Sequence, residues 1–304
     1  MELPQGTFSI VGLDPANGDV GVAVQSRYFA VGAVVSWARA GVGAVATQAA
    51  GRAAYGPEIL DLLARGLKPA EAIERALADD ERHETRQLGA VDAQGRAAAF
   101  TGSECNEWAG HATGSGFAAQ GNILAGEDVV AEMVGAFTQT SGALAERLMA
   151  ALEAAQAAGG DRRGQQSAAL VVERPGGIPE SREGIDRIVD LRVDDHPEPI
   201  RELRRLLDLH ARMRLALDTS GFYERREWGA AIAATEEALT RFPDEPLLLY
   251  NLACYESLDG RRDAALAHLK QALSADPTMR ETARADSDFA RIADEPEFRA
   301  LVES

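Results

Sequence analysis

"TFSIVGLDPANGDVGVAVQS", residues 7–26, contains two apolar runs of strand length on either side of a short polar segment. The runs are 7–13 and 20–26, and the DPANGD between them supplies the Pro, Asn and Gly that favour a turn with positive φ. The stretch therefore predicts a β-hairpin. The pattern continues through 29–38 and 42–48, which predicts four antiparallel strands by residue 48.

Two helix pairs separate these strands from the later ones. Apolar residues recur at helical spacing over 57–66 and 68–80, and again over 125–137 and 143–160. Strand-like runs follow each pair, at 86–102, 167–173 and 185–193. This order predicts an α+β domain, residues 1–197, in which two sheets pack face to face between helical layers.

The last third of the chain has a helical pattern throughout. A connecting helix is expected at 198–214, followed by a helical domain at 215–304. Residues recur there at an offset of 34, as in the pairs Ala231 and Ala265, Ala238 and Ala272, Leu239 and Leu273, Pro243 and Pro277. That period resembles the tetratricopeptide repeat, which implies stacked helix pairs and a protein contact, with the first domain or a sister subunit as the expected partner.

Composition limits the classes of partner. The formal net charge is −17, which would repel phosphate backbones and acidic membrane surfaces, so neither a nucleic acid nor a membrane is expected as a partner. Two cysteines in 304 residues support no disulfide framework, and no apolar run reaches the length of a membrane span. We expect a cytoplasmic protein without metal or organic cofactor.

The first residue of the first strand is a candidate nucleophile. A threonine hydroxyl attacks a carbonyl only when a base removes its proton, and the α-amino group of an N-terminal threonine can be that base. Thr7 would gain this amine if the chain were cleaved after Gly6, and glycine allows the backbone to distort for such a cleavage. The alternative is that Thr7 is simply a β-branched residue that begins a strand.

The strand and helix order resembles that of the N-terminal-nucleophile hydrolases. Within that class, residues 7 to about 195 are similar to the family designated domain of unknown function 1028. The phrases that carry the resemblance are TFSIV (7–11), GVAVQSRYFAVGAVV (21–35), RQLGAVDAQGRAAAFTG (86–102), QGNIL (120–124) and GGDRRGQQSAALVV (159–172). The resemblance implies a four-layer α-β-β-α sandwich.

The resemblance also implies roles for single residues. Thr7 corresponds to the nucleophile, and Ser9, two positions on along the same face, is the second choice. Related enzymes place an acid, then Ser-Arg, at the end of the second strand, where this chain has Gln25, Ser26 and Arg27. These three residues are expected to contact the substrate.

A late strand is expected to complete the catalytic group. The resemblance places Asp161 and Ser167 there, where they would polarise the amine or the hydroxyl. The buried lysine of related enzymes has no counterpart, because the only lysines are Lys68 and Lys270. An arginine would have to supply the positive charge, and it can lower the pKa of an amine but cannot transfer a proton.

Small residues around Gly51 are expected to form the oxyanion site. TQAAGRAAYG, residues 47–56, leaves a strand for a helix and could turn backbone N–H groups toward a ligand, with Gln48 as a substrate contact. Asn122, after Gly121, could donate from another wall of the site, or the two could form a glycine-rich turn.

Recognition of the substrate is expected from an arginine. Arg162 and its neighbour could pair with a carboxylate, so we expect a small, anionic substrate; a phosphate is the alternative. Cys105 and His111 lie close in the sequence, but two such residues without a second pair are weak evidence for a metal or a thiol nucleophile.

Two hypotheses of function follow. The first is an amidohydrolase that cleaves a C–N bond of a small molecule, with Thr7 as nucleophile and the chain assembled as a homo-oligomer. The second is a catalytically silent domain that serves as a binding or assembly platform for the helical repeats. Catalysis without chain cleavage, through Ser9 or Ser26 and a side-chain base such as His111, is a third possibility.

Overall fold

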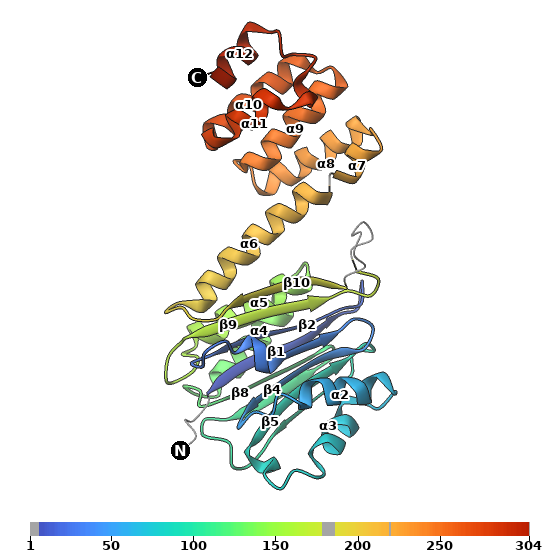
Figure 1. Ribbon diagram of the computed structural model, residues 1–304. Coiled ribbons are helices and arrows are strands. Elements are labelled where there is room, and N and C mark those ends of the chain that lie inside the picture. Colours follow the sequence, from blue (N-terminus) through green and yellow to red (C-terminus); the bar gives the residue numbers. More distant parts are fainter. Residues whose placement is uncertain (1–5, 178–185, 219, 304) are drawn as a thin grey trace. The chain divides into compact units, whose positions relative to one another are not determined.

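The computed structural model describes residues 6–177, 186–218 and 220–303. The chain divides into two compact units, Met1–Leu207 and Asp208–Ser304, and the division falls within helix α6 (Pro199–Asp218). The first unit mixes helices with antiparallel sheets, and the second is helical (Figure 1). The expected boundaries at 197/198 and 214/215 remain predictions.

The strands of the first unit form two antiparallel sheets. A six-stranded sheet has the order β10-β9-β2-β1-β8-β7, and a four-stranded sheet has the order β3-β4-β5-β6. The bounds are β1 (Thr7–Asp14), β2 (Asp19–Ser26), β3 (Ser36–Arg39), β4 (Gly43–Ala49), β5 (Arg86–Asp92), β6 (Ala97–Thr101), β7 (Gly110–Gly114), β8 (Phe117–Asn122), β9 (Ser167–Glu173) and β10 (Arg187–Val193). Besides the beginning of α6, the helices of the first unit are α1 (Gly32–Val35), α2 (Tyr55–Ala64), α3 (Pro69–Leu77), η1 (His83–Thr85), α4 (Asp128–Gln139) and α5 (Leu144–Ala157).

The predicted hairpin of β1 and β2 is confirmed. Asp14 Oδ1 accepts a hydrogen bond from the Ala16 amide at 3.0 Å, and Asn17 Oδ1 accepts one from the Asp19 amide at 2.9 Å. Gly18 lies at φ 78°, in the left-handed region that glycine enters without a steric penalty. This turn fixes the register, so that Thr7 pairs with Ser26 at the open end of the hairpin.

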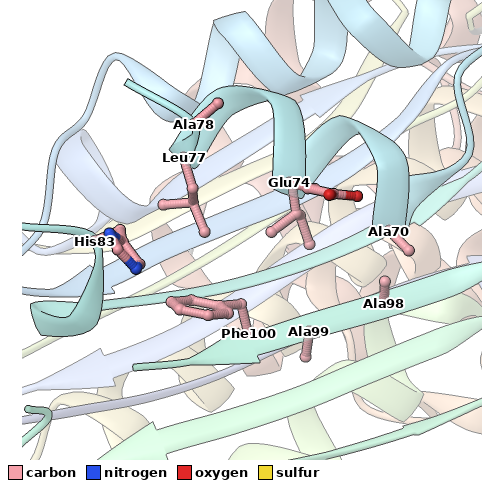
Figure 2. A pocket seen from close by; sticks show the side chains of 9 residues that line it. Ala70, Glu74, Leu77, Ala78, His83, Ala98, Ala99 and Phe100 are labelled. Atoms are coloured by element: carbon pink, nitrogen blue, oxygen red, sulfur yellow. The ribbon is translucent and has the colours of Figure 1, made fainter. Parts of the chain in front are cut away.

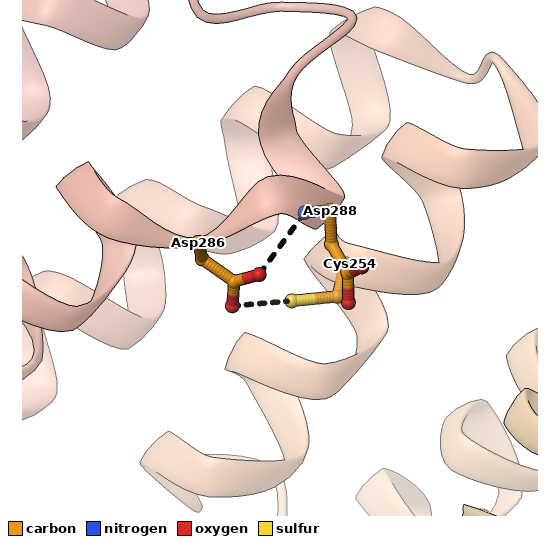
Figure 3. A group of neighbouring side chains, drawn as sticks. All are labelled: Cys254, Asp286 and Asp288. Carbon is orange, nitrogen blue, oxygen red and sulfur yellow. Dashed lines mark hydrogen bonds between the residues drawn. The ribbon is translucent and has the colours of Figure 1, made fainter.

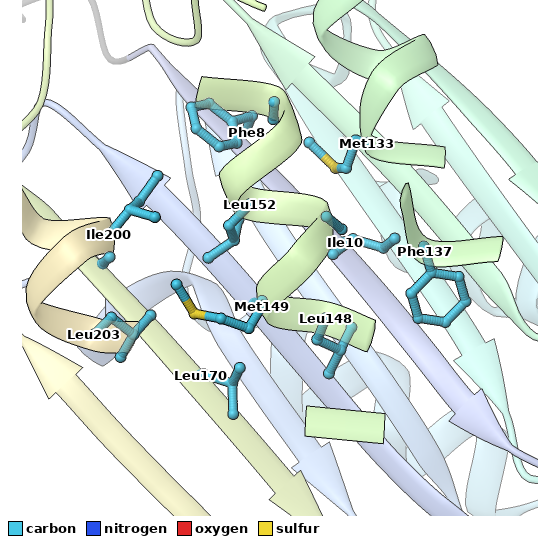
Figure 4. Packing of buried hydrophobic residues seen from close by; sticks show 14 of the residues in the cluster. Phe8, Ile10, Met133, Phe137, Leu148, Met149, Leu152, Leu170, Ile200 and Leu203 are labelled. Carbon is cyan, nitrogen blue, oxygen red and sulfur yellow. The ribbon is translucent and has the colours of Figure 1, made fainter. Parts of the chain in front are cut away.

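Alternation along the strands assigns each side chain to one of two cores. Phe8 and Ile10 face α4 and α5, which cover the outer face of the six-stranded sheet together with the beginning of α6 (Figure 4). Val11 faces the four-stranded sheet and packs there with Ala44 and other buried residues. A third core lies between the four-stranded sheet and the helices α2 and α3. The first unit therefore has the predicted succession of a helical layer, two sheets and a second helical layer.

Two segments differ from the sequence-based expectation. The region 29–38 was expected to be one strand, but it contains helix α1 before the short strand β3. Ala30 has φ 52°, and Gly32 approaches Ala169 so closely that a Cβ would lie 2.4 Å from the Ala169 Cβ. The second segment is β8, where Gly121 and Asn122 lie in an internal strand, so the glycine-rich turn that was the alternative for them is wrong.

The second unit contains the helices after residue 207. Their bounds are α7 (Ser220–Glu224), α8 (Trp228–Arg241), α9 (Pro246–Asp259), α10 (Arg262–Ala275), η2 (Pro277–Met279), α11 (Arg280–Ala285), η3 (Ser287–Phe289) and α12 (Pro296–Glu303). Helix α10 begins and ends 34 positions after α8, which is the offset seen in the sequence. Ala231 and Ala265 are fully buried at equivalent positions in one core. Of the helices in the described ranges, none has the length and apolar character that crossing a membrane requires.

Candidate active site

The beginning of β1 brings several polar residues into one row across the six-stranded sheet. Thr7 pairs in register with Ser26 on one side and with Asn122 on the other, and Ser26 pairs with Ser167. The Thr7 side chain is 3% exposed, and its Oγ1 donates a hydrogen bond to the Ser26 Oγ at 3.0 Å. The Ser26 hydroxyl donates in turn to the carbonyl oxygen of Gly6 at 2.5 Å. A continuous chain of hydrogen bonds therefore connects the Thr7 hydroxyl to the carbonyl of the preceding peptide bond.

Arg163 is the second donor to the same carbonyl. Its Nη2 lies 2.7 Å from the Gly6 oxygen and 2.7 Å from Asp161 Oδ2. Asp161 Oδ1 also accepts from the backbone amide of Arg163 at 2.9 Å, and Oδ2 from that of Arg27 at 3.1 Å. The Asp161 side chain is fully buried, whereas that of Arg163 is 24% exposed. The carboxylate thus fixes the guanidinium against the peptide bond that precedes Thr7.

Glycine is required immediately before Thr7. A Cβ on Gly6 would lie 2.8 Å and 2.9 Å from the two carboxylate oxygens of Asp161, and 2.9 Å from the Ile123 Cβ. These separations are shorter than real Cβ contacts allow. Asp161 therefore lies directly against the backbone of the Gly6–Thr7 junction.

A small cavity of about 110 Å³ opens beside Thr7. Its polar lining comes from Thr7, Thr47, Gln48 and Gly51. The apolar and aromatic lining residues are Tyr28, Val31, Val34, Val35, Ala49 and Ala53. None of the described residues that line it is Asp, Glu, Lys, Arg or His.

Ser167 and Gly51 lie beside the cavity and make hydrogen bonds of their own. The Ser167 hydroxyl donates to the Tyr28 carbonyl at 2.5 Å and accepts from the Val31 amide at 3.0 Å, so it positions the segment that forms one cavity wall. The Gly51 amide donates to the Ala49 carbonyl at 2.7 Å. Asp161 lies against Gly6 at the junction with Thr7, whereas Ser167 contacts the wall rather than the Thr7 hydroxyl.

Gln25 lies on the opposite face of the sheet, which corrects its expected place beside Thr7. It immediately precedes Ser26 in β2, so its side chain points to the face that α4 and α5 cover. Gln25 is fully buried, and within the described part of the chain neither its Oε1 nor its Nε2 has a hydrogen-bond partner. The substrate contact expected of Gln25 is therefore wrong on geometric grounds, because the β-sheet lies between Gln25 and the cavity.

The arginines expected to bind an anion do not line the cavity. Arg27 donates from Nη1 to the Arg163 carbonyl at 2.8 Å and lines a separate depression of about 310 Å³ with Asp195 and His196. Arg162 donates from Nη2 to the Glu107 carbonyl at 2.7 Å. Arg163, which was considered with Arg162 for the recognition of a carboxylate, is the arginine that reaches the junction.

A network of buried amide side chains joins the two sheets behind Thr7. Ser9 donates to Gln48 Oε1 at 2.6 Å and accepts from Gln120 Nε2 at 2.7 Å. Gln48 Nε2 donates to the Thr7 carbonyl at 3.2 Å and to Gln87 Oε1 at 2.8 Å, and Gln87 Oε1 also accepts from Asn122 Nδ2 at 2.9 Å.

This network gives several predicted residues a structural role. Ser9, Gln48 and Asn122 are near Thr7 as expected, and they also hold its strand in place. Sequence reasoning missed Gln87 and Gln120, because a single glutamine in a strand does not indicate a partner on another strand.

Cys105 and His111 are held by different partners. The Cys105 thiol donates to the Arg86 carbonyl at 3.3 Å, and burial raises its pKa to about 11. His111 Nδ1 lies 2.8 Å from Thr101 Oγ1, and burial lowers the pKa of the imidazole. A thiol with a raised pKa is a poor nucleophile near neutral pH.

A group of side chains with metal-ligand spacing lies in the second unit instead. Among the described residues it consists of Cys254, Asp286 and Asp288 (Figure 3). Asp286 accepts from the Tyr250 hydroxyl at 2.9 Å and from the Asp288 amide at 3.0 Å. These contacts fasten the turn η3 to helix α9, which accounts for the cluster without an ion.

A larger cavity, of about 380 Å³, lies between α3 and β6 (Figure 2). Its lining is mostly apolar, with Ile73 and Leu77 from the helix and Phe100 from the strand, and Glu74 and His83 add polar groups. No residue expected to belong to the active site lines it.

Comparison with known proteins identifies the first unit. The profile of a family of unknown function, DUF1028, matches residues 7–203. The chain is also similar to protein SPO2555 from Silicibacter pomeroyi, described by the same family, whose crystal structure superposes with a TM-score of 0.61 at 36% sequence identity. That similarity covers 67% of this chain and 85% of the other. Among curated proteins, none matches the chain.

Proposed function

The chain belongs to the family of unknown function DUF1028, and for this member we propose an N-terminal-nucleophile hydrolase that cleaves a C–N amide bond with Thr7 as its nucleophile. The layers of helices and sheets suit this class, and the strand order also resembles that of its members. We assign the second unit a tetratricopeptide-like fold on its 34-residue offset. The observation that carries the proposal is the hydrogen-bonded chain from Thr7 Oγ1 through Ser26 to the Gly6 carbonyl.

The first step of the proposed activation is attack on the chain's own peptide bond. Thr7 Oγ1 adds to the Gly6 carbonyl carbon while its proton passes to Ser26, and the Ser26 proton passes to the carbonyl oxygen. Until this proton arrives, Arg163 stabilises the negative charge that develops on the oxygen in the transition state. The two donors are already in hydrogen-bond contact with the atom on which that charge appears.

The second step releases the amine. The bond between the Gly6 carbon and the Thr7 nitrogen breaks, the nitrogen takes the proton back through Ser26, and the Gly6 acyl group remains as an ester on Thr7 Oγ1. Water then hydrolyses the ester, which leaves a carboxylate on Gly6 and a free α-amino group on Thr7. With an ordinary pKa of about 7.7 to 8.0, this amine can act as the base in later turnovers.

The processed site would treat an external amide in the same way. Departure of Gly6 leaves the Ser26 hydroxyl and the Arg163 guanidinium without that carbonyl, and both can then hold the carbonyl oxygen of a substrate. The Gly51 amide is not needed for this role, since it donates to Ala49. Thr7 takes the acyl group, the amine product leaves, and water completes the turnover.

The experiment compares the intact mass of the wild-type chain with that of Thr7→Ala. The wild type should lose residues 1–6, because its hydroxyl can attack Gly6, and Thr7→Ala should keep them. Thr113→Ala is the matched control, since it makes the same substitution at an exposed position of β7 in the same sheet and should leave processing intact. A Thr7→Ala chain that is processed like the wild type would exclude Thr7 as the nucleophile.

A catalytically silent platform is the second candidate. It is favoured by the absence of the lysine that related enzymes use. The Asp161 carboxylate is paired instead with Arg163 and with two backbone amides. In that case Gly6 would remain attached in the wild-type protein as well as in Thr7→Ala.

A further inference from the structure

The cavity beside Thr7 has a lining that selects the chemistry of the substrate. Val31 and Val35 are almost completely buried, and Tyr28 and Val34 contribute further apolar surface. The polar groups among its described lining residues are hydroxyls, the Gln48 amide and backbone. A carboxylate placed there would lose its water without gaining a charged partner from any of the described lining side chains, which is costly.

The arginines of the site do not line the cavity. Arg163 holds Asp161 and the carbonyl-oxygen position that Gly6 occupies, and Arg162 donates to the Glu107 carbonyl. Arg27 lines a different depression. An anionic substrate was expected because of such arginines, and their positions remove the basis of that expectation.

The apolar wall is formed before any ligand binds. Ser167 holds the Tyr28 carbonyl and the Val31 amide, and the Ala30 amide donates to the Asp194 carbonyl at 3.0 Å. Ala30 is fixed at φ 52°, a conformation that turns the chain between Phe29 and Val31. The wall therefore does not need to be ordered by the substrate.

The cavity is also small. Its volume of about 110 Å³ is well below the roughly 300 to 1,000 Å³ of pockets that enclose drug-sized ligands. Of the lining residues, Tyr28 and Val34 are 38% and 37% exposed, and Phe29, which follows Tyr28 in the chain, is 63% exposed. Only a short group fits inside, and the remainder of a substrate would lie against these exposed side chains.

From the lining, the positions of the arginines outside it and the volume, we infer that the substrate of this site is an amide whose acyl group is short, aliphatic and uncharged. The inference rests on the proposed function of Thr7. The acyl group occupies the cavity beside Val31 and Val35, its carbonyl oxygen lies at Ser26 and Arg163, and the amine portion extends over Tyr28 and Phe29.

Two chromogenic anilides of similar acyl size test the inference on the full-length protein. N-isovaleryl-p-nitroaniline should be hydrolysed with a kcat/KM at least about tenfold higher than N-succinyl-p-nitroaniline, because only the second buries a charge. Binding of isovalerate and of succinate, measured by calorimetry on the same sample, provides a readout that is independent of turnover, and only isovalerate should bind.

A variant with an added positive charge tests the preference between the two anilides. Val34→Arg places a cation at the cavity wall on a partly exposed position and should shift the ratio toward the succinyl anilide by about tenfold or more. Leu247→Arg is the matched control, since Leu247 is also 37% exposed but belongs to the second unit, and it should leave the ratio unchanged.

The outcomes separate this inference from the proposed function. A processed chain that prefers the succinyl anilide overturns the substrate class and leaves Thr7 as the nucleophile. A processed chain that hydrolyses neither anilide and does not bind isovalerate also overturns the substrate class. A chain that keeps residues 1–6 and hydrolyses neither anilide overturns both.

Discussion

Arg163 donates a hydrogen bond of 2.7 Å to the carbonyl oxygen of Gly6, although 157 positions separate the two residues in the chain. The same guanidinium pairs with the fully buried carboxylate of Asp161. This arrangement places a fixed positive charge on the peptide bond before Thr7. Each of the following predictions changes one part of this junction or of the framework that supports it.

Gly6→Ala should slow or abolish processing. The new Cβ would meet the Asp161 carboxylate and Ile123 at less than 3.0 Å, so the junction must shift away from its donors. Overpacking of this kind typically costs about 1–3 kcal/mol in the free energy of unfolding. Intact mass and thermal unfolding measure the two effects. Gly126→Ala is the control, because nothing lies within 4 Å of its Cβ position, and an equal loss in both variants would contradict the steric explanation.

Arg163→Met should destabilise the protein and slow processing, whereas Arg162→Met should do neither. Removing Arg163 leaves the Asp161 charge buried without its ion-pair partner, at a cost of about 3–5 kcal/mol in the free energy of unfolding. The loss of a donor to the developing oxyanion should slow cleavage about 10²- to 10³-fold. Denaturant unfolding and the time course of intact mass provide the measurements. Normal processing in Arg163→Met would show that Ser26 alone suffices.

Gln87→Leu should lower the free energy of unfolding by about 1–3 kcal/mol, because it leaves Gln48 Nε2 and Asn122 Nδ2 without their shared acceptor. When Gln87→Leu is combined with Gln48→Met, the loss in unfolding free energy should be smaller than the sum of the two single losses, since the two side chains satisfy each other's hydrogen bonds. Denaturant unfolding of the four proteins gives the coupling. Strict additivity would mean that the two amides stabilise the sheets independently.

Asp80→Asn should destabilise the protein at neutral pH and have less effect in acid. Hydrogen bonds from Arg86 and Tyr55 hold the pKa of Asp80 well below its ordinary value of 3.8, so the stabilising effect of its charge is fully present above that value. It is lost as the pH falls through the lowered pKa of the folded state. The difference in unfolding free energy between wild type and variant should therefore shrink below about pH 4.

Urea unfolding from pH 7 down to the lowest pH at which the wild type still folds gives this difference. Asp79→Asn, at the exposed neighbouring position, serves as the control for loss of one negative charge. A destabilisation by Asp80→Asn that grows in acid would contradict the lowered pKa.

Patterns among neighbouring residues were sufficient to predict most of the helices and strands of the first unit. The turn formed by Asp14, Asn17 and Gly18 and the period of two in β1 are properties of neighbouring residues, so the hairpin and the two faces of its strands could be predicted. That Gly6 directly precedes Thr7 can likewise be seen without knowledge of the fold. The segment 29–38 was missed because the close approach of Gly32 to Ala169 is a tertiary contact.

Local patterns were enough to predict most of the strands, the helix pairs and the candidate hydroxyl, because each depends on residues close together in the chain. Which side chains meet that hydroxyl depends on contacts between distant segments. A shift of one position in a strand moves a side chain to the other face, which separates Gln25 from Ser26. The pairing of β1 with β2 and β8, and the loop before β9, bring Ser26, Asn122 and Arg163 to the same strand end. Register between distant segments depends on the packing of the whole sheet, so no local pattern could reveal it.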